Sequence, residues 1–428
     1  MINFDFHKYV SNYVKKEDKV EYLEKAREIK SRFVDGDLKY WNKLDTFITS
    51  QELKKIVNMT DYIRSNCDVF VVIGIGGSYM GSKAVIEALS PMYNKKGPEI
   101  IFLGTNLCSE EYYETLEYLK DKDVIVNVIS KSGTTLEPSI AFSLIMDLMN
   151  KKYKEEDLKD RIIITTDPEK GDLRNLANLK GYVTFTVPEQ VGGRFSCLTP
   201  VGLLPIAVAG IDILKLINGA RASYERIDRA IEYAVIRDIM FKKGKTIESF
   251  TVYNPKLYYF TEWLKQLFAE TQGKDKKGIL PISSVNTRDL HSLGQFLQEG
   301  NNIIFETVIG IDKDKMVTLD KYDMELNSIN KIALDKVGLA HYNGDTPSNL
   351  ISVEEKNEET IGELIHFFIL SAIVGALIMG TGMSLAMTDI GSYLGMSGNV
   401  GFVFGIVIGV IGMLMAIINY PIYKRIMS

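Results

Sequence analysis

A short apolar run followed by a glycine-rich turn decides the fold class: Val69–Ile73 (VFVVI), then Gly74–Ser78 (GIGGS). The run is rich in β-branched residues, which favour strands, and the turn leads into a helical stretch at Ser82–Leu89. Because every residue of the run is apolar, we expect a strand that is buried on both faces, as in a parallel sheet covered by helices.

The same alternation of apolar runs and helical stretches continues along the chain. Four further strands are expected in the first sheet: Glu99–Leu103, Val124–Ile129, Arg161–Thr166 and Tyr182–Val187. A second unit has expected strands at Ile247–Val252, Ile279–Ile282 and Ile303–Val308, and expected helices at Thr199–Ile217, Ser223–Phe241, Tyr258–Glu270 and Asp289–Gln298. The sequence therefore predicts an α/β protein with two doubly wound parallel-sheet domains, while residues 1–65 are expected to be helical and charged.

The distribution of charge divides the chain into two unequal parts. The 428 residues carry 50 Lys and Arg and 55 Asp and Glu, and the net charge of −5 gives no support to nucleic-acid binding. Residues 364–428 contain only three of these charges: Asp389, Lys424 and Arg425. We place an N-terminal helical segment at 1–50, the first α/β domain at 51–190, the second at 191–373 and a hydrophobic tail at 374–428.

The apolar part contains two long stretches, Leu364–Met387 and Val400–Ile418. A helix needs about 20 apolar residues to cross a bilayer core, and each stretch is close to that length. The short link Thr388–Asn399 suits a hairpin between them. Lys424 and Arg425 would keep the C-terminus on the cytosolic side. We therefore predict a C-terminal hydrophobic helical hairpin.

This hairpin would give membrane contact through residues 364–420 and would anchor a cytoplasmic body, since the first residues carry no secretory signal. One alternative is that residues 364–380 form a buried core helix and that only the second stretch inserts. Another is that the tail comes from a joined reading frame.

Two loops have the composition of a phosphate site. Ser130–Thr135 (SKSGTT) brings four hydroxyls, a lysine and a glycine to the end of one expected strand and the start of a helix. Hydroxyls, N-terminal amides and the charge of Lys131 can surround a phosphate; a hydroxyl-rich helix cap is the structural alternative. Gly74–Ser78 follows another strand of the same sheet and lacks the Walker A pattern, so the two loops favour a monophosphate over a nucleotide.

Five segments, in this order, resemble the glucose-6-phosphate isomerase family of the bacterial type, which is built from sugar-phosphate isomerase domains. They are Val71–Ser78, Ser130–Thr135, Gly192–Ser196, Gln266–Lys274 and His291–Gln295. The resemblance covers most of residues 60–310. It implies an aldose–ketose isomerase that interconverts glucose 6-phosphate and fructose 6-phosphate, needs no metal or cofactor, and forms a homodimer with shared active sites.

The resemblance also implies roles for ten residues. Glu270 is implied as the base that carries the proton, Arg194 as the cation beside the enediolate, and His291 as the ring opener that reaches the site from the partner subunit. Substrate-binding residues are implied at Gly77, Ser78, Ser130, Lys131, Ser132, Thr135 and Gln266. From the residues alone, Glu270 is a carboxylate at a helix end that disfavours negative charge, and a lone histidine such as His291 is more often structural.

The sequence departs from the family at residues 374–380. The family continues with a helix that supplies a lysine for ring opening and a glutamine for the phosphate. Here no lysine occurs between Lys356 and Lys424, and no glutamine follows Gln298. Two other hypotheses therefore stay open: a catalytically impaired, membrane-attached sugar-phosphate binding protein, and an isomerase of another sugar phosphate.

Overall fold

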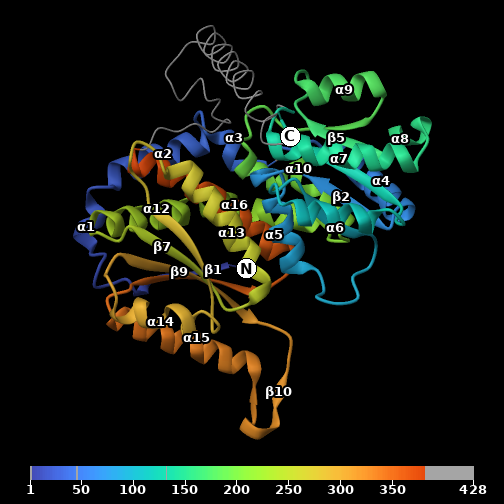
Figure 1. The fold of residues 1–428 in the computed structure, drawn as a ribbon. Helices are drawn as coiled ribbons and strands as arrows, with labels where there is room; N and C mark the ends of the chain where they lie inside the picture. The colour runs from blue at the N-terminus through green and yellow to red at the C-terminus, as the bar shows by residue number, and fades with distance from the viewer. Residues whose placement is uncertain (1, 45–46, 132, 381–428) are drawn as a thin grey trace, which may run out of the picture. The chain divides into compact units, whose positions relative to one another are not determined.

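The computed structural model describes residues 2–44, 47–131 and 133–380, which contain two five-stranded sheets (Figure 1). The first sheet contains β2 (Val69–Ile73), β3 (Glu99–Leu103), β4 (Val124–Ile129), β5 (Ile162–Thr166) and β6 (Val183–Thr186). Its order is β3-β2-β4-β5-β6, and every neighbouring pair is parallel. The strands expected from the sequence are confirmed, three of them with the expected bounds.

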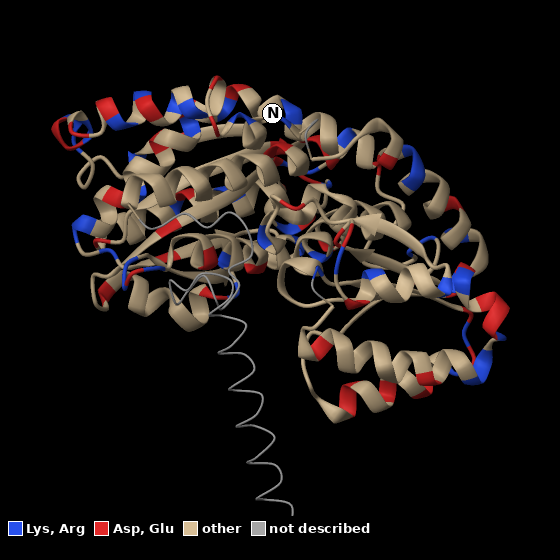
Figure 2. Ribbon diagram, turned by 90° about the horizontal axis from the view of Figure 1, so that it is seen from above, with Lys and Arg blue, Asp and Glu red and all other residues tan. Residues whose placement is uncertain are grey.

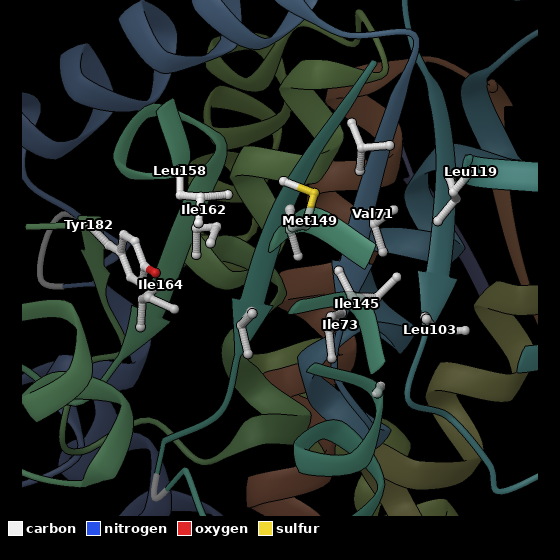
Figure 3. Packing of buried hydrophobic residues seen from close by; sticks show 14 of the residues in the cluster. Val71, Ile73, Leu103, Leu119, Ile145, Met149, Leu158, Ile162, Ile164 and Tyr182 are labelled. Carbon is white, nitrogen blue, oxygen red and sulfur yellow. The ribbon is translucent and has the colours of Figure 1, made fainter. Parts of the chain in front are cut away.

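Helices connect the strands of the first sheet and cover its faces. They are α4 (Ser50–Asn66), α5 (Met80–Leu89), α6 (Ser109–Leu119), α7 (Leu136–Lys152), α8 (Glu155–Arg161) and α9 (Asp172–Lys180). The core on one face places alternate residues of β2, such as Val71 and Ile73, against α7 (Figure 3). Ile145 and Met149 meet them because residues four apart share one face of a helix. This packing fixes the carboxyl edge of the sheet, from which the two predicted loops emerge.

The second sheet contains β1 (Ile2–Tyr9), β7 (Ile247–Val252), β8 (Leu280–Val285), β9 (Ile304–Lys313) and β12 (Ser348–Glu355). Its order is β1-β12-β9-β7-β8, with β1 antiparallel and the other neighbours parallel. The helices around it are α11 (Ile213–Ala222), α12 (Ile227–Lys242), α13 (Tyr258–Gln272), α14 (Leu290–Glu299), α15 (Leu326–Asn343) and α16 (Glu358–Met379). The preceding helix, α10 (Pro200–Val208), packs instead against α4 and α5 of the first sheet. The predicted α/β class is confirmed, since the first sheet is parallel and the second is parallel except for its edge strand β1.

The helices of the second sheet form layers on its two sides. Helices α12, α13 and α16 lie on one side, and α14 and α15 lie on the other (Figure 1). The first of these layers also reaches the first sheet, because α13 packs against α5. The contact brings the end of β2 and the body of α13 to one place, and the candidate site is built there.

The structure corrects two details of the expected secondary structure. Residues 2–9, expected to be helical, form a strand, because Ile2 and Phe4 pair with Val353 and Ile351 at the edge of the second sheet. Short helices follow at α1 (Lys16–Val20), α2 (Leu23–Val34) and α3 (Lys39–Asn42). The single helix expected over residues 199–217 is divided into α10 and α11, with a break at Ala209–Asp212.

Helix α16 corrects the membrane prediction in the part that the structure describes. Within residues 2–44, 47–131 and 133–380, it is the one helix long and apolar enough to cross a bilayer, but nearly all of it is buried against protein. It packs against α11, α12 and α13, and Gly362 allows the close approach, since a Cβ there would lie 1.9 Å from the carbonyl oxygen of Leu216. Residues 364–380 therefore form a buried core helix, as in the alternative given above, and not a membrane span. The rest of the predicted hairpin, 381–428, lies outside the described residues.

Charged side chains are spread over the outer helices, and Lys and Arg alternate with Asp and Glu along them (Figure 2).

Capping boxes mark where two of the helices begin. Thr49 and Glu52 form a reciprocal capping box at α4, and Asn357 and Thr360 form one at α16.

Candidate active site

The end of α13 presents an accessible carboxylate, that of Glu270. Gln266 and Glu270 lie four residues apart and so share a face of the helix, and the helix ends at Gly273 as expected. The Glu270 side chain is 43% exposed, whereas its neighbours Thr271 and Gln272 are buried.

Arg194 lies beneath this carboxylate and is held from several directions. Its Nη1 donates to Oε1 of Glu270 at 2.9 Å, and its Nε donates to the hydroxyl of Thr271 at 2.7 Å. The guanidinium also stacks over the ring of Phe195, with 4.5 Å to the ring centroid. Burial lowers the pKa of Arg194, while the negative charge of Glu270 opposes that shift. The pair therefore joins a fixed, buried cation to a carboxylate that solvent can reach.

Gln266 holds the second oxygen of the carboxylate, since its Nε2 donates to Oε2 of Glu270 at 3.1 Å. The side-chain carbonyl oxygen of Gln266 is buried and makes no hydrogen bond within the described part of the chain. A buried acceptor without a donor is costly, so this oxygen is available to a donor that reaches it. Lys274 adds positive charge near Glu270; its pKa is lowered, first by burial and next by the charge of Arg194.

The glycine turn after β2 touches the Arg194 segment backbone to backbone. A Cβ at Gly77 would lie 2.0 Å from the carbonyl carbon of Gly193 and 2.5 Å from the nitrogen of Arg194, so residue 77 has to be glycine for this approach. The hydroxyl of Ser196 spans the contact, donating to the carbonyl oxygens of Gly193 at 2.7 Å and of Gly77 at 3.3 Å. The first sheet thereby sets the position of the cation. Ser78 lies in the same turn, directly after Gly77.

A buried polar network anchors the turn of α13 that carries Glu270. Gln272 Oε1 accepts from Arg237 Nη1 at 2.6 Å, and its Nε2 donates to the carbonyl oxygen of Ala372 in α16 at 3.0 Å. Arg237 is paired in turn with Glu248 of β7 at 2.7 Å, and both side chains are fully buried. The helix end is thus fixed to α12, β7 and α16.

The second predicted loop follows β4, the neighbour of β2 in the first sheet. The hydroxyl of Ser130 accepts from the Gly133 backbone N–H at 3.0 Å, and Thr135 forms the N-cap of α7. Lys131 Nζ donates to the carbonyl oxygen of Glu189 at 2.7 Å, and burial lowers the pKa of Lys131. Lys131 therefore reaches the segment that follows β6, and the N-terminus of α7 closes this loop. Ser132 lies outside the described residues.

His291 lies apart from these groups. It is on the first turn of α14, on the other side of the second sheet from α13, with an exposed side chain (Figure 1). Among the residues that the structure describes, its imidazole makes no hydrogen bond and no ion pair. The described residues also contain no group of three His, Cys, Asp or Glu side chains that could hold a metal.

Comparison with known proteins shows the family of the chain. Residues 39–384 match the family model described as phosphoglucose isomerase. The chain belongs to the phosphoglucose isomerase family. The glucose-6-phosphate isomerase of Listeria monocytogenes serovar 1/2a is 41% identical over 413 residues, which cover 89% of this chain and 91% of that protein. The enzyme of the same name from Staphylococcus aureus strain RF122 is 43% identical, covering 81% and 83%.

Solved structures support the fold of this phosphoglucose isomerase family member. The crystal structure of a glucose-6-phosphate isomerase from Chlamydia trachomatis has a TM-score of 0.70 at 20% identity, covering 88% of this chain and 77% of that one. A hypothetical protein from Thermus thermophilus has a TM-score of 0.78 at 23% identity, covering 92% and 98%. The family match stops at residue 384, close to the predicted departure at residues 374–380.

The sequence analysis did not identify the residues that hold Arg194. Thr271 and Trp263 both lie on α13; Trp263 Nε1 donates to the carbonyl oxygen of Arg194 at 3.1 Å. Thr271 directly follows Glu270, so its position in the family segment Gln266–Lys274 could have indicated a role near Arg194. The role of Trp263 depends on the contact between α13 and residues 193–198, which spacing along the chain does not reveal.

Proposed function

We propose that this chain interconverts glucose 6-phosphate and fructose 6-phosphate, with Glu270 as the base that carries the proton between C2 and C1. The observation that carries the proposal is the 2.9 Å contact between Glu270 and Arg194, which pairs an accessible base with a fixed cation. The family supports the substrate, because its relatives carry the name of this reaction. The family also supports a cytoplasmic place for residues 1–380.

The reaction requires one base and one cation at the reacting carbons. On the open-chain substrate, a carboxylate oxygen of Glu270 removes the proton from C2, and the electron pair moves towards O1 to form an enediolate. Arg194 stabilises the developing charge without reorganising, because Thr271, Phe195 and Trp263 hold it beforehand. Protonated Glu270 then returns the proton to C1 as O2 becomes the carbonyl oxygen and its hydroxyl proton passes to O1.

The first sheet supplies the phosphate end of the site in this proposal. Ser130, Lys131, Ser132 and Thr135 bind the phosphate, while Gly77, Ser78 and Gln266 contact the sugar. The support is the position of the two loops at the ends of neighbouring parallel strands, where open α/β sheets bind their ligands.

Replacing Glu270 by Gln tests the base. The change keeps the size of the side chain and an acceptor for Arg194, but it removes the basic carboxylate and the acceptor for Gln266. We therefore expect kcat to fall about 10³–10⁴-fold with phosphate binding nearly intact. The assay follows glucose 6-phosphate formed from fructose 6-phosphate through a coupled dehydrogenase. Glu262→Gln is the matched control, since Glu262 lies on the same helix and pairs with Lys265. Isomerisation retained in Glu270→Gln would refute the assignment.

The same assay separates the isomerase from a binding protein without turnover. The family match ends at residue 384, and the lysine and glutamine of the family's next helix are absent from this sequence. A binding protein would be stabilised against heat by glucose 6-phosphate but would form no product. A chimaera in which the family's C-terminal helix replaces residues 381–428 extends this test. If only the chimaera is active, the tail is the cause of the lost isomerase activity.

We further propose a homodimer in which His291 opens the sugar ring in the site of the second copy. Exposed apolar side chains on the helix of His291 support this proposal: Leu293 and Phe296 on α14. Such a surface is typical of a protein–protein contact.

Subunit complementation tests this arrangement. Chains with Glu270→Gln are mixed with chains with His291→Ala under conditions of subunit exchange. If His291 acts across the dimer, half of the dimers are mixed and each has one intact site, so activity returns to about a quarter of the unmodified level. If His291 acts within its own chain, the mixture stays as inactive as its components.

A further inference from the structure

The chain contains two tryptophans, and both contact the short segment Gly193–Leu198 that carries Arg194. Trp263 of α13 holds the backbone of Arg194. Trp41 comes from near the start of the chain, in the short helix α3, and its ring meets the ring of Phe195 with 5.0 Å between centroids and 62° between planes. The Phe195 ring in turn carries the Arg194 guanidinium on its face. Trp41 therefore supports the ring that lies beneath the proposed enediolate cation.

The guanidinium and the two rings form three layers, and each layer limits the movement of the next. Rings that meet edge to face at about 5 Å are in a favourable geometry. Both rings are almost completely buried, with an exposed fraction of 4% for Trp41 and 2% for Phe195. Because protein interiors are close-packed, a ring in such a place cannot shift unless its neighbour gives way. Trp41 consequently sets the position of the stacking surface that Phe195 offers to Arg194.

Trp41 is itself fixed from two directions. Its ring packs edge to face against Phe47, with 5.3 Å between centroids. Its backbone carbonyl oxygen accepts a hydrogen bond from Nε2 of His366 in the buried helix α16 at 3.0 Å. The family match includes α3, since it begins at residue 39. The support beneath Arg194 is therefore in place before a substrate binds.

The proposed reaction explains why a fixed Phe195 ring matters. Arg194 stabilises the enediolate only if its guanidinium is already in position as the negative charge develops. One of its contacts is the 2.9 Å ion pair with Glu270, and that pair weakens at the same moment, because Glu270 becomes neutral when it takes the proton. The position of the guanidinium then depends on contacts that the proton transfer does not alter, and the stack on Phe195 is one of them.

We propose that Trp41 is a positioning residue of the isomerase reaction, which holds Phe195 and, through it, the Arg194 guanidinium in place while Glu270 carries the proton. This inference rests on the function proposed above for Glu270 and Arg194. It gives the N-terminal helical segment a part in the reaction.

Steady-state kinetics of Trp41→Leu in the coupled assay test the proposal. Leucine keeps the place apolar but removes the ring edge, so kcat should fall about tenfold or more. The KM for fructose 6-phosphate should stay within about twofold, because the proposed phosphate loop is unchanged. Trp41→Phe keeps an aromatic edge and should recover most of the lost kcat. Tyr112→Leu is the matched control, since it also truncates a buried ring, in α6, and it should leave kcat unchanged.

A second background shows whether Trp41 acts through Arg194. In chains that already carry Arg194→Lys, the planar guanidinium is gone, so Trp41→Leu should lower kcat by less than about twofold more. An equal loss of kcat in both backgrounds would overturn the proposal, because Trp41 would then act on the fold and not on the cation.

Fluorescence gives a readout that does not depend on turnover. Both Trp41 variants leave Trp263 as the single tryptophan, and its indole N–H donates to the carbonyl oxygen of Arg194. Without the support of an aromatic ring, the Arg194 segment loosens and water reaches Trp263, so the emission maximum of Trp41→Leu should lie at longer wavelength than that of Trp41→Phe.

Each outcome has one meaning. Unchanged kcat in Trp41→Leu, or the same emission maximum in both variants, overturns the positioning role and leaves the isomerase standing. An unmodified chain that forms no product overturns the proposed function instead, and the emission comparison then decides by itself whether Trp41 positions Arg194.

Discussion

Replacing Gly375 by Ala tests whether α16 supports the catalytic helix. A Cβ at residue 375 would lie 2.2 Å from Nε2 of Gln272 and 3.4 Å from Nη1 of Arg237. The Gln272 side chain would have to move, and it would lose its bonds to Arg237 at 2.6 Å and to the carbonyl oxygen of Ala372 at 3.0 Å. The turn that carries Glu270 would then lose its anchor.

The expected magnitude follows from these two bonds. One involves a charged donor and the other is neutral, so their loss costs about 2–4 kcal/mol in the free energy of unfolding. Alanine in place of glycine inside a helix returns about 1 kcal/mol. The net destabilisation is about 1–3 kcal/mol, and the displaced carboxylate should lower kcat about tenfold or more.

Urea unfolding, together with the coupled isomerase assay, measures both effects. Gly294→Ala is the matched control, because its added Cβ would find its nearest neighbour, Leu290 Cβ, at 3.9 Å. That variant should become more stable by about 0.5–1 kcal/mol. The reasoning is refuted if Gly375→Ala is stabilised as much as Gly294→Ala.

Two other predictions concern pH and the glycine turn. His366 is fully buried between Trp41 and Ser223, and burial lowers its pKa to about 4. As the pH falls, the unfolded chain therefore binds a proton at His366 before the folded chain does, so the free energy of unfolding should fall by about 1.5 kcal/mol from pH 6.5 to pH 5. Urea unfolding midpoints should show this fall. The variant His366→Leu should lose the part of the pH dependence that comes from this histidine. Gly77→Ala would force apart the backbones of residues 77 and 193–194 and should reduce kcat/KM about 100-fold; a reduction below about threefold in steady-state kinetics would contradict the backbone contact.

The sequence predicted the structure best where a run of apolar residues requires burial on both faces of a strand. The apolar runs at residues 69–73 and 124–129 can be strands only if both faces are covered, and the structure has them so. Glu270 and Gln266 were recognised from a family segment, and the structure places both beside Arg194. The roles of the three residues remain proposals.

Prediction failed where the partner lies far away in the chain. Residues 2–9 form a strand whose pairing partner, β12, lies about 340–350 residues later in the chain. The apolar pattern of α16 satisfies the length rule for a membrane span, but a helix surrounded by α11, α12 and α13 has the same composition. The hydrophobic pattern of a helix indicates which of its faces are apolar, but it does not indicate whether lipid or protein covers them.

The pairing of β1 with β12 also has a consequence for how the chain folds during synthesis. Ile2 and Phe4 leave the ribosome first, yet β12, the strand with which they pair, ends at residue 355. At about 5–20 residues per second, that delay is roughly 20–70 s. During that time β1 has no strand to pair with, while the first sheet, complete by residue 186, is free to form. The nascent chain should therefore depend on chaperones most strongly for its first ten residues, although these lie far from the proposed active-site residues in sequence.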